Sequence, residues 1–270
     1  MKRFYITKTL SVQERRIFEF IRSEGWILFN SKDIKESRQF KNWSNILSNL
    51  KRKEWIQQIE RGKYILSPIT YSGDIHSFLI GTRLVEPSAA AYASALNHYG
   101  MTEQIPNIIY VQTTKRKKSK KILNVQYNFV NIKARKFFGL RKEWIDRNFY
   151  LITDLEKTVL DCLDHPEYAG GFTEAIKGFY LAHERIDKEK LWQYAIQLDN
   201  NTVIKRIAYL SEVLNLKYFE EFRTKAKKIL SLMYTVFDPM SPRIGKRISR
   251  WRLLVNINEQ DIKAIAGIQP

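Results

Sequence analysis

An α+β fold in two domains is predicted by three features of this 270-residue chain. The first 70 residues combine helical hydrophobic spacing with two short β-rich runs. Up to residue 150 the chain mixes short apolar runs with one alanine-rich segment, and from residue 151 helical patterns dominate. We therefore expect one domain at 1–70 and a second at 71–270, with a mixed α/β part (71–150) and a mainly helical part (151–270).

Three short helices are predicted in the first domain. Ser11 and Glu14 have the spacing of a capping box and start the first helix, which Gly25 ends. The second helix is expected over 32–36 and the third over 42–54.

Two β-rich runs follow, at 55–60 and 64–68, and flank the turn Arg61-Gly62-Lys63. Three helices followed by a basic-tipped hairpin is the order of a winged helix-turn-helix. The predicted fold is thus an N-terminal winged helix-turn-helix followed by a larger mixed α/β domain that ends in a mainly helical region. The third helix of such a domain enters the DNA major groove, and the hairpin reaches flanking phosphates.

Positive charge is concentrated in two zones. The chain has 46 Lys and Arg against 28 Asp and Glu, a net charge of +18. Residues 1–70 hold 15 basic and 7 acidic side chains, and residues 114–142 hold 11 basic and none acidic. One run of charge is often only a solvated surface, but two separate zones favour a polyanion partner. We expect duplex DNA.

The predicted DNA-contacting side chains are amides and hydroxyls that reach base edges and cations that reach phosphates. They are Lys41, Asn42, Ser44, Asn45, Ser48, Lys51, Arg52, Arg61 and Lys63. A second basic zone is expected on an exposed loop or hairpin tip, to contact nucleic acid or a protein. It comprises Lys115, Arg116, Lys117, Lys118, Lys120 and Lys121. The alternative for the first domain is a winged helix used for protein contact.

The second domain is predicted to open with a helix over 88–96, capped by Ser88, and a buried strand at 108–111. Two strands near 122–126 and 127–132 and a final strand at 251–256 are also expected. The helices of its second half are expected at 154–163, 172–183, 187–198, 201–214 and 217–230.

Several classes of protein are disfavoured. A single cysteine excludes a disulfide framework, and the four histidines are scattered, so we expect no metal site and no cofactor. No apolar run reaches about 18 residues, and the N-terminal residues lack the apolar core of a secretory signal. We therefore expect a cytoplasmic protein without a membrane partner.

Acidic residues near position 160 are the main candidates for catalysis. Glu156, Asp161 and Asp164 lie close in sequence, but Lys157 and Asp161 have the i,i+4 spacing of an ion pair. We interpret the group as a salt-bridged helix surface and Cys162 as a small core residue. The prediction is that the chain is not an enzyme.

Several segments of the second domain resemble the AbiEi-type antitoxin and transcriptional-regulator family of type IV toxin–antitoxin systems. They are Glu86-Pro87-Ser88, the stretch from Asp154 to Leu163, Pro166 with Gly170-Gly171, the stretch from Lys205 to Glu212, and Gly245 before Arg250-Trp251. The block Glu156-Lys157-Thr158 with the later double glycine is the most specific of them. One departure is Ile207-Ala208, where the family pattern is closer to Leu-Gly.

The resemblance implies a division of labour between the domains. In that family the N-terminal domain represses its own operon through operator inverted repeats upstream of the gene. The C-terminal domain counters a nucleotidyltransferase-like toxin, usually encoded next door and often without a stable complex. Under this resemblance, the protein that the second basic zone could contact is the toxin.

Two other functions remain open at this stage. One is a defence-related nuclease with a winged-helix targeting domain, which requires carboxylates that converge in the folded second domain. The other is an RNA-binding protein that uses residues 114–142.

Overall fold

The computed structural model describes residues 9–67, 76–104 and 107–268. It confirms a mixed α+β fold with helices and several sheets. Two compact units are present: residues 1–86 with 142–150, and residues 87–141 with 151–270. The predicted boundary at residue 70 lies outside the described residues. The units differ from the predicted domains because residues 76–86 and 142–150 also belong to the first unit.

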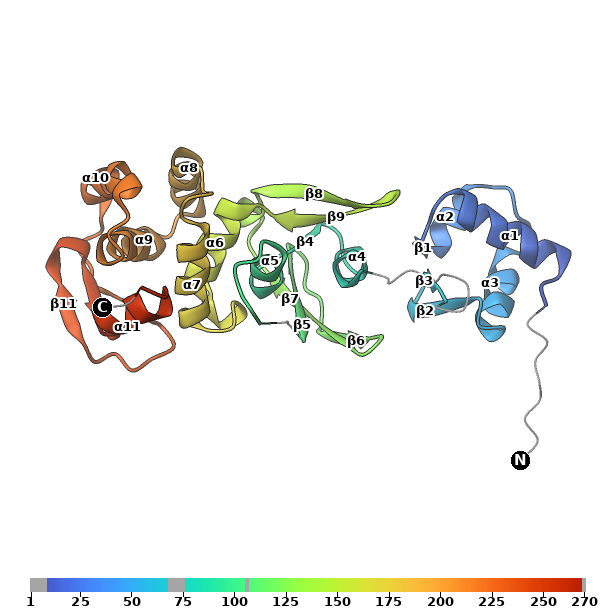
Figure 1. Cartoon of the computed structure of the whole chain (residues 1–270). Coiled ribbons are helices and arrows are strands. Elements are labelled where there is room, and N and C mark those ends of the chain that lie inside the picture. Colours follow the sequence, from blue (N-terminus) through green and yellow to red (C-terminus); the bar gives the residue numbers. More distant parts are fainter. Residues whose placement is uncertain (1–8, 68–75, 105–106, 269–270) are drawn as a thin grey trace, which may run out of the picture. The chain divides into compact units, whose positions relative to one another are not determined.

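The first unit begins with three helices and a three-stranded antiparallel sheet (Figure 1). In chain order these are α1 (Val12–Ser23), β1 (Leu28–Asn30), α2 (Ser31–Glu36), α3 (Trp43–Arg52), β2 (Ile56–Glu60) and β3 (Lys63–Leu66). Strand β3 is central and pairs with both β1 and β2. The three helices and the two hairpin strands therefore occupy the predicted positions. Helix α4 (Ser77–Arg83), which belongs to the same unit, was not predicted.

Local sequence explains how α1 starts and why α3 has two unlike faces. The Ser11 amide donates to the Glu14 carboxylate at 2.8 Å, and the Glu14 amide donates to the Ser11 hydroxyl at 3.3 Å, which confirms the capping box. Buried side chains from α1, β1, α2, α3, β2 and β3 then form one core. They are Ile17, Phe18, Ile21, Phe29, Ile34, Ile46, Leu47, Leu50, Ile56 and Leu66. Because α3 gives only one face to this core, its other face is left to solvent.

A six-stranded mixed sheet follows, with the strand order β6-β7-β5-β4-β9-β8. The strands are β4 (Ser88–Ala90), β5 (Ile108–Thr113), β6 (Lys120–Ile122), β7 (Val125–Asn131), β8 (Leu140–Ile145) and β9 (Asn148–Thr153). Strands β5 and β7 run parallel as neighbours, whereas β6 is antiparallel to β7. The basic run after β5 is therefore a connection between strands, as one prediction had it, and not the tip of a hairpin.

The predicted helix over 88–96 is wrong in its first half. Ser88 is a strand residue paired with Thr113, so it does not cap a helix. Tyr92 has φ +55°, a left-handed value that ends the extended backbone after β4 and precedes α5 (Ala93–His98). The alanines favour a helix in isolation, but sheet pairing overrides this weak preference. Their small side chains also fit a strand that is fully buried.

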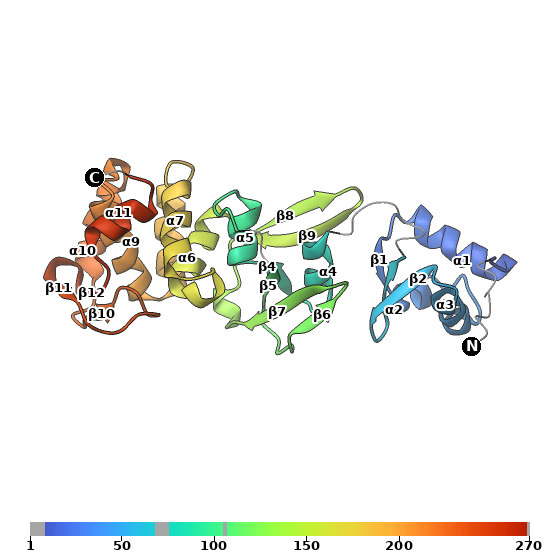
Figure 2. The ribbon, with the colours of Figure 1, turned by 60° about the horizontal axis from the view of Figure 1, so that its bottom comes forward.

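The helical region agrees closely with its predicted spans. It contains α6 (Leu155–Asp164), α7 (Phe172–Ala182), α8 (Lys188–Leu198), α9 (Asn201–Val213) and α10 (Glu220–Ile229). Within the second unit, α6 and α7 lie side by side (Figure 2). Gly170 and Gly171, at φ +92° and +115°, form the turn before α7. Cys162 is fully buried in the core of this unit, as predicted.

A small C-terminal sheet and a last helix complete the second unit. They are β10 (Thr235–Val236), β11 (Lys246–Ile248), β12 (Leu253–Val255) and α11 (Glu259–Ile265), with strand order β10-β12-β11. Only the strand near β12 was predicted. None of the helices in the described part of the chain is long and apolar enough to cross a membrane.

Candidate functional site

The outer face of α3 is the main candidate site, because it carries exposed polar side chains on a rigid element. Ile46, Leu47 and Leu50 are buried beneath it. The exposed side chains on and just before α3 are Lys41, Asn42, Ser44, Asn45, Ser48, Lys51 and Arg52. The structure therefore gathers seven of the nine predicted contact residues on this part of the molecule.

The start of α3 is fixed by Asn42. This residue has φ +55°, a left-handed conformation that asparagine tolerates better than most residues. Its carbonyl accepts the amides of Asn45 at 3.0 Å and Ile46 at 3.2 Å. The first turn, which carries Ser44 and Asn45, thus has a defined position relative to the core.

Two cations at the end of α3 stay exposed although each makes a hydrogen bond. The Lys51 ammonium donates to Gln58 Oε1 of β2 at 3.0 Å, and the Arg52 guanidinium donates to Asn49 Oδ1 at 3.2 Å. Both partners are neutral amides, so neither positive charge is compensated by these bonds. The two side chains present a positive edge beside the polar face of α3.

Lys53, the next cation, has a structural role. Its ammonium lies 2.6 Å from the Glu14 carboxylate of α1 and 2.9 Å from the Thr9 carbonyl. Burial alone would raise the pKa of Glu14, but the hydrogen bonds from Lys53 and Ser11 hold this pKa below its usual value. Lys53 therefore joins α3 to α1 and is not part of the exposed face.

The hairpin tip presents one of its two predicted cations to solvent. Gly62 has φ +74°, and its carbonyl accepts the Ser31 amide at 2.7 Å, which ties the turn to α2. Arg61 is exposed. The Lys63 ammonium instead donates to the carbonyls of Arg83 at 2.8 Å and Leu84 at 2.6 Å, at the end of α4. The structure therefore does not bring Lys63 to the free tip.

The second basic zone follows β5 in the second unit. Lys115, Arg116, Lys118 and Lys121 are exposed. Lys117 is half-buried, with its ammonium 5.9 Å from the centre of the Phe129 ring, and Lys120 is the first residue of β6. The six cations lie on one connection and one edge strand, so the zone is continuous.

The predicted salt-bridged surface on α6 is wrong, because the pair is buried. The Lys157 ammonium donates to Asp161, which also accepts the Gln112 side-chain amide, and Lys157 and Asp161 are 0% and 3% exposed. Burial raises the pKa of Asp161 although Lys157 lies beside it. Because α5, α7, α8 and α9 all pack against α6, this helix has almost no solvent face.

The acidic residues of α6 do not converge on one point. Glu156 accepts the Asp187 amide at 2.9 Å and pairs with Lys190 at 2.8 Å. Burial would lower the pKa of Lys190, but Glu156 and Asp154 raise it above its usual value. Asp164 pairs with Lys136 at 3.0 Å. Among the residues that the structure describes, no cluster of histidine, cysteine and acidic side chains could hold a metal ion.

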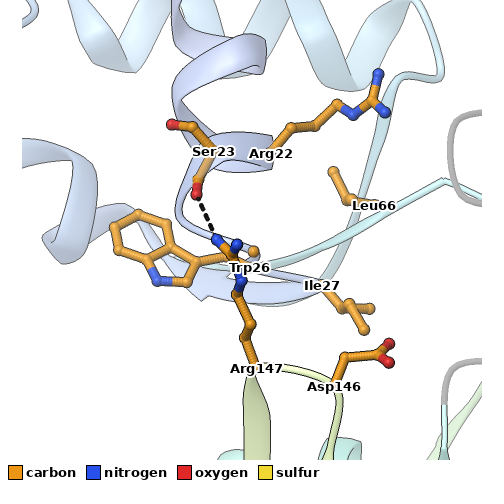
Figure 3. A pocket seen from close by; sticks show the side chains of 8 residues that line it. Arg22, Ser23, Trp26, Ile27, Leu66, Asp146 and Arg147 are labelled. Atoms are coloured by element: carbon orange, nitrogen blue, oxygen red, sulfur yellow. Dashed lines mark hydrogen bonds between the residues drawn. The ribbon is translucent and has the colours of Figure 1, made fainter.

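A hollow of about 500 Å³ lies within the first unit (Figure 3). It is lined by Arg22, Ser23, Gly25, Trp26, Ile27, Leu66, Asp146 and Arg147. The Arg147 guanidinium donates to the Ser23 carbonyl at 3.2 Å, and the Asn148 amide donates to the Gly25 carbonyl at 2.9 Å (Figure 3 shows the first bond). These contacts occupy carbonyls at the end of α1 and explain why residues 142–150 belong to this unit.

Comparison with known proteins finds one solved structure with a similar fold. No protein-family model matches the chain, and no curated protein matches its sequence. The crystal structure of the RV2827C protein from Mycobacterium tuberculosis is similar, with a TM-score of 0.63 over 96% of both chains. Sequence identity is 13%, so the similarity concerns the fold alone.

Proposed function

We propose that the first unit is a winged helix-turn-helix that binds duplex DNA. In this proposal α3 is the recognition helix, and the β2-β3 hairpin is the wing that follows the neighbouring phosphates. The observation that carries the proposal is the outer face of α3, where amides and hydroxyls are exposed above a fully apolar inner face.

The chemistry of that face matches the needs of a DNA-reading helix. Ser44, Asn45 and Ser48 can donate and accept hydrogen bonds at base edges, as major-groove readout requires. Lys51, Arg52 and Arg61 supply the phosphate contacts that orient such a domain. Lys51 and Arg52 at the end of α3 and Arg61 at the neighbouring hairpin are all exposed, which is where contacts to flanking phosphates are needed.

We further propose that the chain is an autorepressor and an antitoxin of the AbiEi type. The support is the resemblance of its motifs, which implies a nucleotidyltransferase-like toxin encoded next door. The cytoplasmic location expected from the sequence is where such a pair would act. Two winged helices would occupy the halves of an inverted repeat upstream of the gene. No catalytic role is assigned to the chain, in keeping with acidic side chains of α6 that each have separate partners.

Binding of the full-length protein to the DNA upstream of its own gene tests the DNA-binding half. Fluorescence anisotropy with a shuffled duplex and a structured RNA as competitors, at near-physiological salt, is expected to show a preference of about 10³-fold or more for the upstream duplex. Equal affinity for all three would contradict sequence-specific repression.

Co-expression with the neighbouring gene tests the antitoxin half. Expression of the neighbour alone is expected to arrest growth, and expression of this chain to restore it. Growth that stays arrested, or a neighbour that is not toxic, would remove the antitoxin assignment while leaving DNA binding intact.

A further inference from the structure

The hollow of the first unit carries charges of both signs. Arg22, in the last turn of α1, and Asp146, in the turn between β8 and β9, both line it, and both are exposed. Within the described part of the chain, neither side chain has a hydrogen-bond or ion-pair partner. Two opposite charges are therefore available to a ligand on one concave surface.

A close approach at Gly25 builds the wall of the hollow. This residue has φ +71°, and a Cβ atom at its position would lie 2.8 Å from Cδ of Arg147, which is too close. The bonds from Arg147 to the Ser23 carbonyl and from Asn148 to the Gly25 carbonyl hold the β8–β9 turn there. Specific contacts thus shape the hollow before any ligand binds, as in most small-molecule sites.

The floor of the hollow is apolar. Ile27 and Leu66 lie side by side, because the Leu66 amide donates to the Ile27 carbonyl at 3.0 Å, and the half-buried Trp26 adds an aromatic ring to the lining. In Figure 3 the Arg22 guanidinium and the Asp146 carboxylate lie on opposite sides of Ile27 and Leu66. The hollow therefore offers an apolar surface with a positive group at one end and a negative group at the other.

We propose that this hollow binds a small zwitterion whose carboxylate and ammonium groups are joined by an aliphatic chain. Arg22 pairs with the carboxylate, because a guanidinium group matches its two oxygens, and Asp146 pairs with the ammonium. A simple anion would meet the Asp146 carboxylate, and a simple cation would meet Arg22 and Arg147. The inference is independent of the proposed function, because no residue of α3 lines the hollow.

Three probes of equal chain length separate the contributions of the two charges. The compound 6-aminohexanoate carries both charges, hexanoate carries the carboxylate alone, and hexylamine carries the ammonium alone. Saturation-transfer NMR titrations with the full-length protein measure the three affinities. We expect 6-aminohexanoate to bind with a Kd of about 1 mM, which is typical of so small a ligand, and each single-charge probe to bind about tenfold more weakly. Equal affinity for all three probes would overturn the inference.

Neutral substitutions then show whether each charge acts where the structure places it. Arg22→Gln should weaken binding of 6-aminohexanoate about tenfold and should not weaken binding of hexylamine. Asp146→Asn should also weaken binding of 6-aminohexanoate about tenfold and should not weaken binding of hexanoate. Asparagine tolerates the φ of +51° at this position, so the turn is kept. Arg15→Gln is the matched control, because Arg15 is exposed on α1 but does not line the hollow, and it should change affinity by less than about twofold.

All three substituted residues are exposed, so the variants should unfold at nearly the wild-type urea midpoint, which circular dichroism measures. Affinity for 6-aminohexanoate that falls as much in Arg15→Gln as in Arg22→Gln would overturn the inference. So would an Asp146→Asn variant that binds hexanoate and 6-aminohexanoate with equally reduced affinity, because the ammonium would then not be paired with Asp146.

Discussion

Helices α3 and α6 have similar sequence patterns and opposite surroundings. Each has an apolar stripe at helical spacing with polar or charged residues between its members, which predicts one buried and one solvent face. On α3, Lys51 and Arg52 are exposed, as this pattern predicts. On α6, Lys157 and Asp161 are fully enclosed, because four other helices surround it. The pattern on one helix therefore does not reveal how many neighbours that helix has.

The comparison also separates two uses of charge. A cation on an exposed face is available to a ligand and contributes little to stability. A buried cation with one carboxylate partner is indispensable to the fold once it is present, because removal of either partner leaves an uncompensated charge in a dry core.

The largest expected effect follows from that difference. Lys157→Ala should lower the free energy of unfolding by about 3–5 kcal/mol, because Asp161 loses its charged partner while it stays buried. Lys51→Ala, the matched change on α3, should stay within about 0.5 kcal/mol of the wild type. Urea unfolding followed by circular dichroism measures both. Equal losses in the two variants would mean that α6 is as exposed as α3.

Next in size is the effect of Asn45→Ala on DNA recognition. Loss of an amide at a base edge should reduce discrimination between the upstream and shuffled duplexes by about 1–3 kcal/mol, with a smaller loss of affinity for the shuffled duplex. Competition anisotropy provides the two affinities. If both fall equally, Asn45 contacts the phosphate backbone and not a base.

A smaller effect distinguishes the two cations of the hairpin. Arg61→Ala should reduce the slope of log affinity against log salt by about 0.9, the value for one lost phosphate contact. Lys63→Ala should leave that slope unchanged, because its ammonium is bound to carbonyls at the end of α4. Titrations at four or five salt concentrations measure the slopes. A reduced slope for Lys63→Ala would show that this side chain leaves α4 to contact DNA.

The smallest expected effect is the pH dependence of the link between α1 and α3. Because the folded pKa of Glu14 is depressed, its contribution to stability is complete above the unfolded pKa, about 4.3, and is lost as the pH falls through the folded pKa. Wild type should therefore lose its advantage over Glu14→Gln in that acidic window. Urea midpoints between pH 7 and pH 3 measure it, and a constant difference would contradict the assigned pKa direction.

Elements that depend on neighbouring residues could be predicted from the sequence. Ser11 with Glu14 sets the start of α1, and Gly62 sets the hairpin turn, because both involve bonds or dihedral angles within a few residues. Helices α1, α2 and α3 of the first unit and α6 to α10 of the second lie close to their predicted spans for the same reason. The exposed residues of α3 could likewise be inferred from its buried stripe.

What the sequence did not reveal depends on distant partners. Ser88 and its alanines form a strand because β5 and β9 lie on either side of β4. The Lys63 ammonium is held away from the hairpin tip because it donates to the Arg83 carbonyl, twenty residues further along the chain. Lys205 supports the turn at 231–233 from another helix. No local pattern encodes these pairings, so only the folded chain shows them.

Site-specific photo-cross-linking to the upstream duplex tests the central claim most directly. A benzophenone side chain at Ser48, on the exposed face of α3, should cross-link to bases at equivalent positions in each half of an inverted repeat, and one at Lys118 serves as the comparison in the second basic zone. Cross-links from Ser48 to defined bases are the predicted result. Cross-links from Lys118 alone, or none from Ser48 when the duplex is saturated, would contradict recognition by α3.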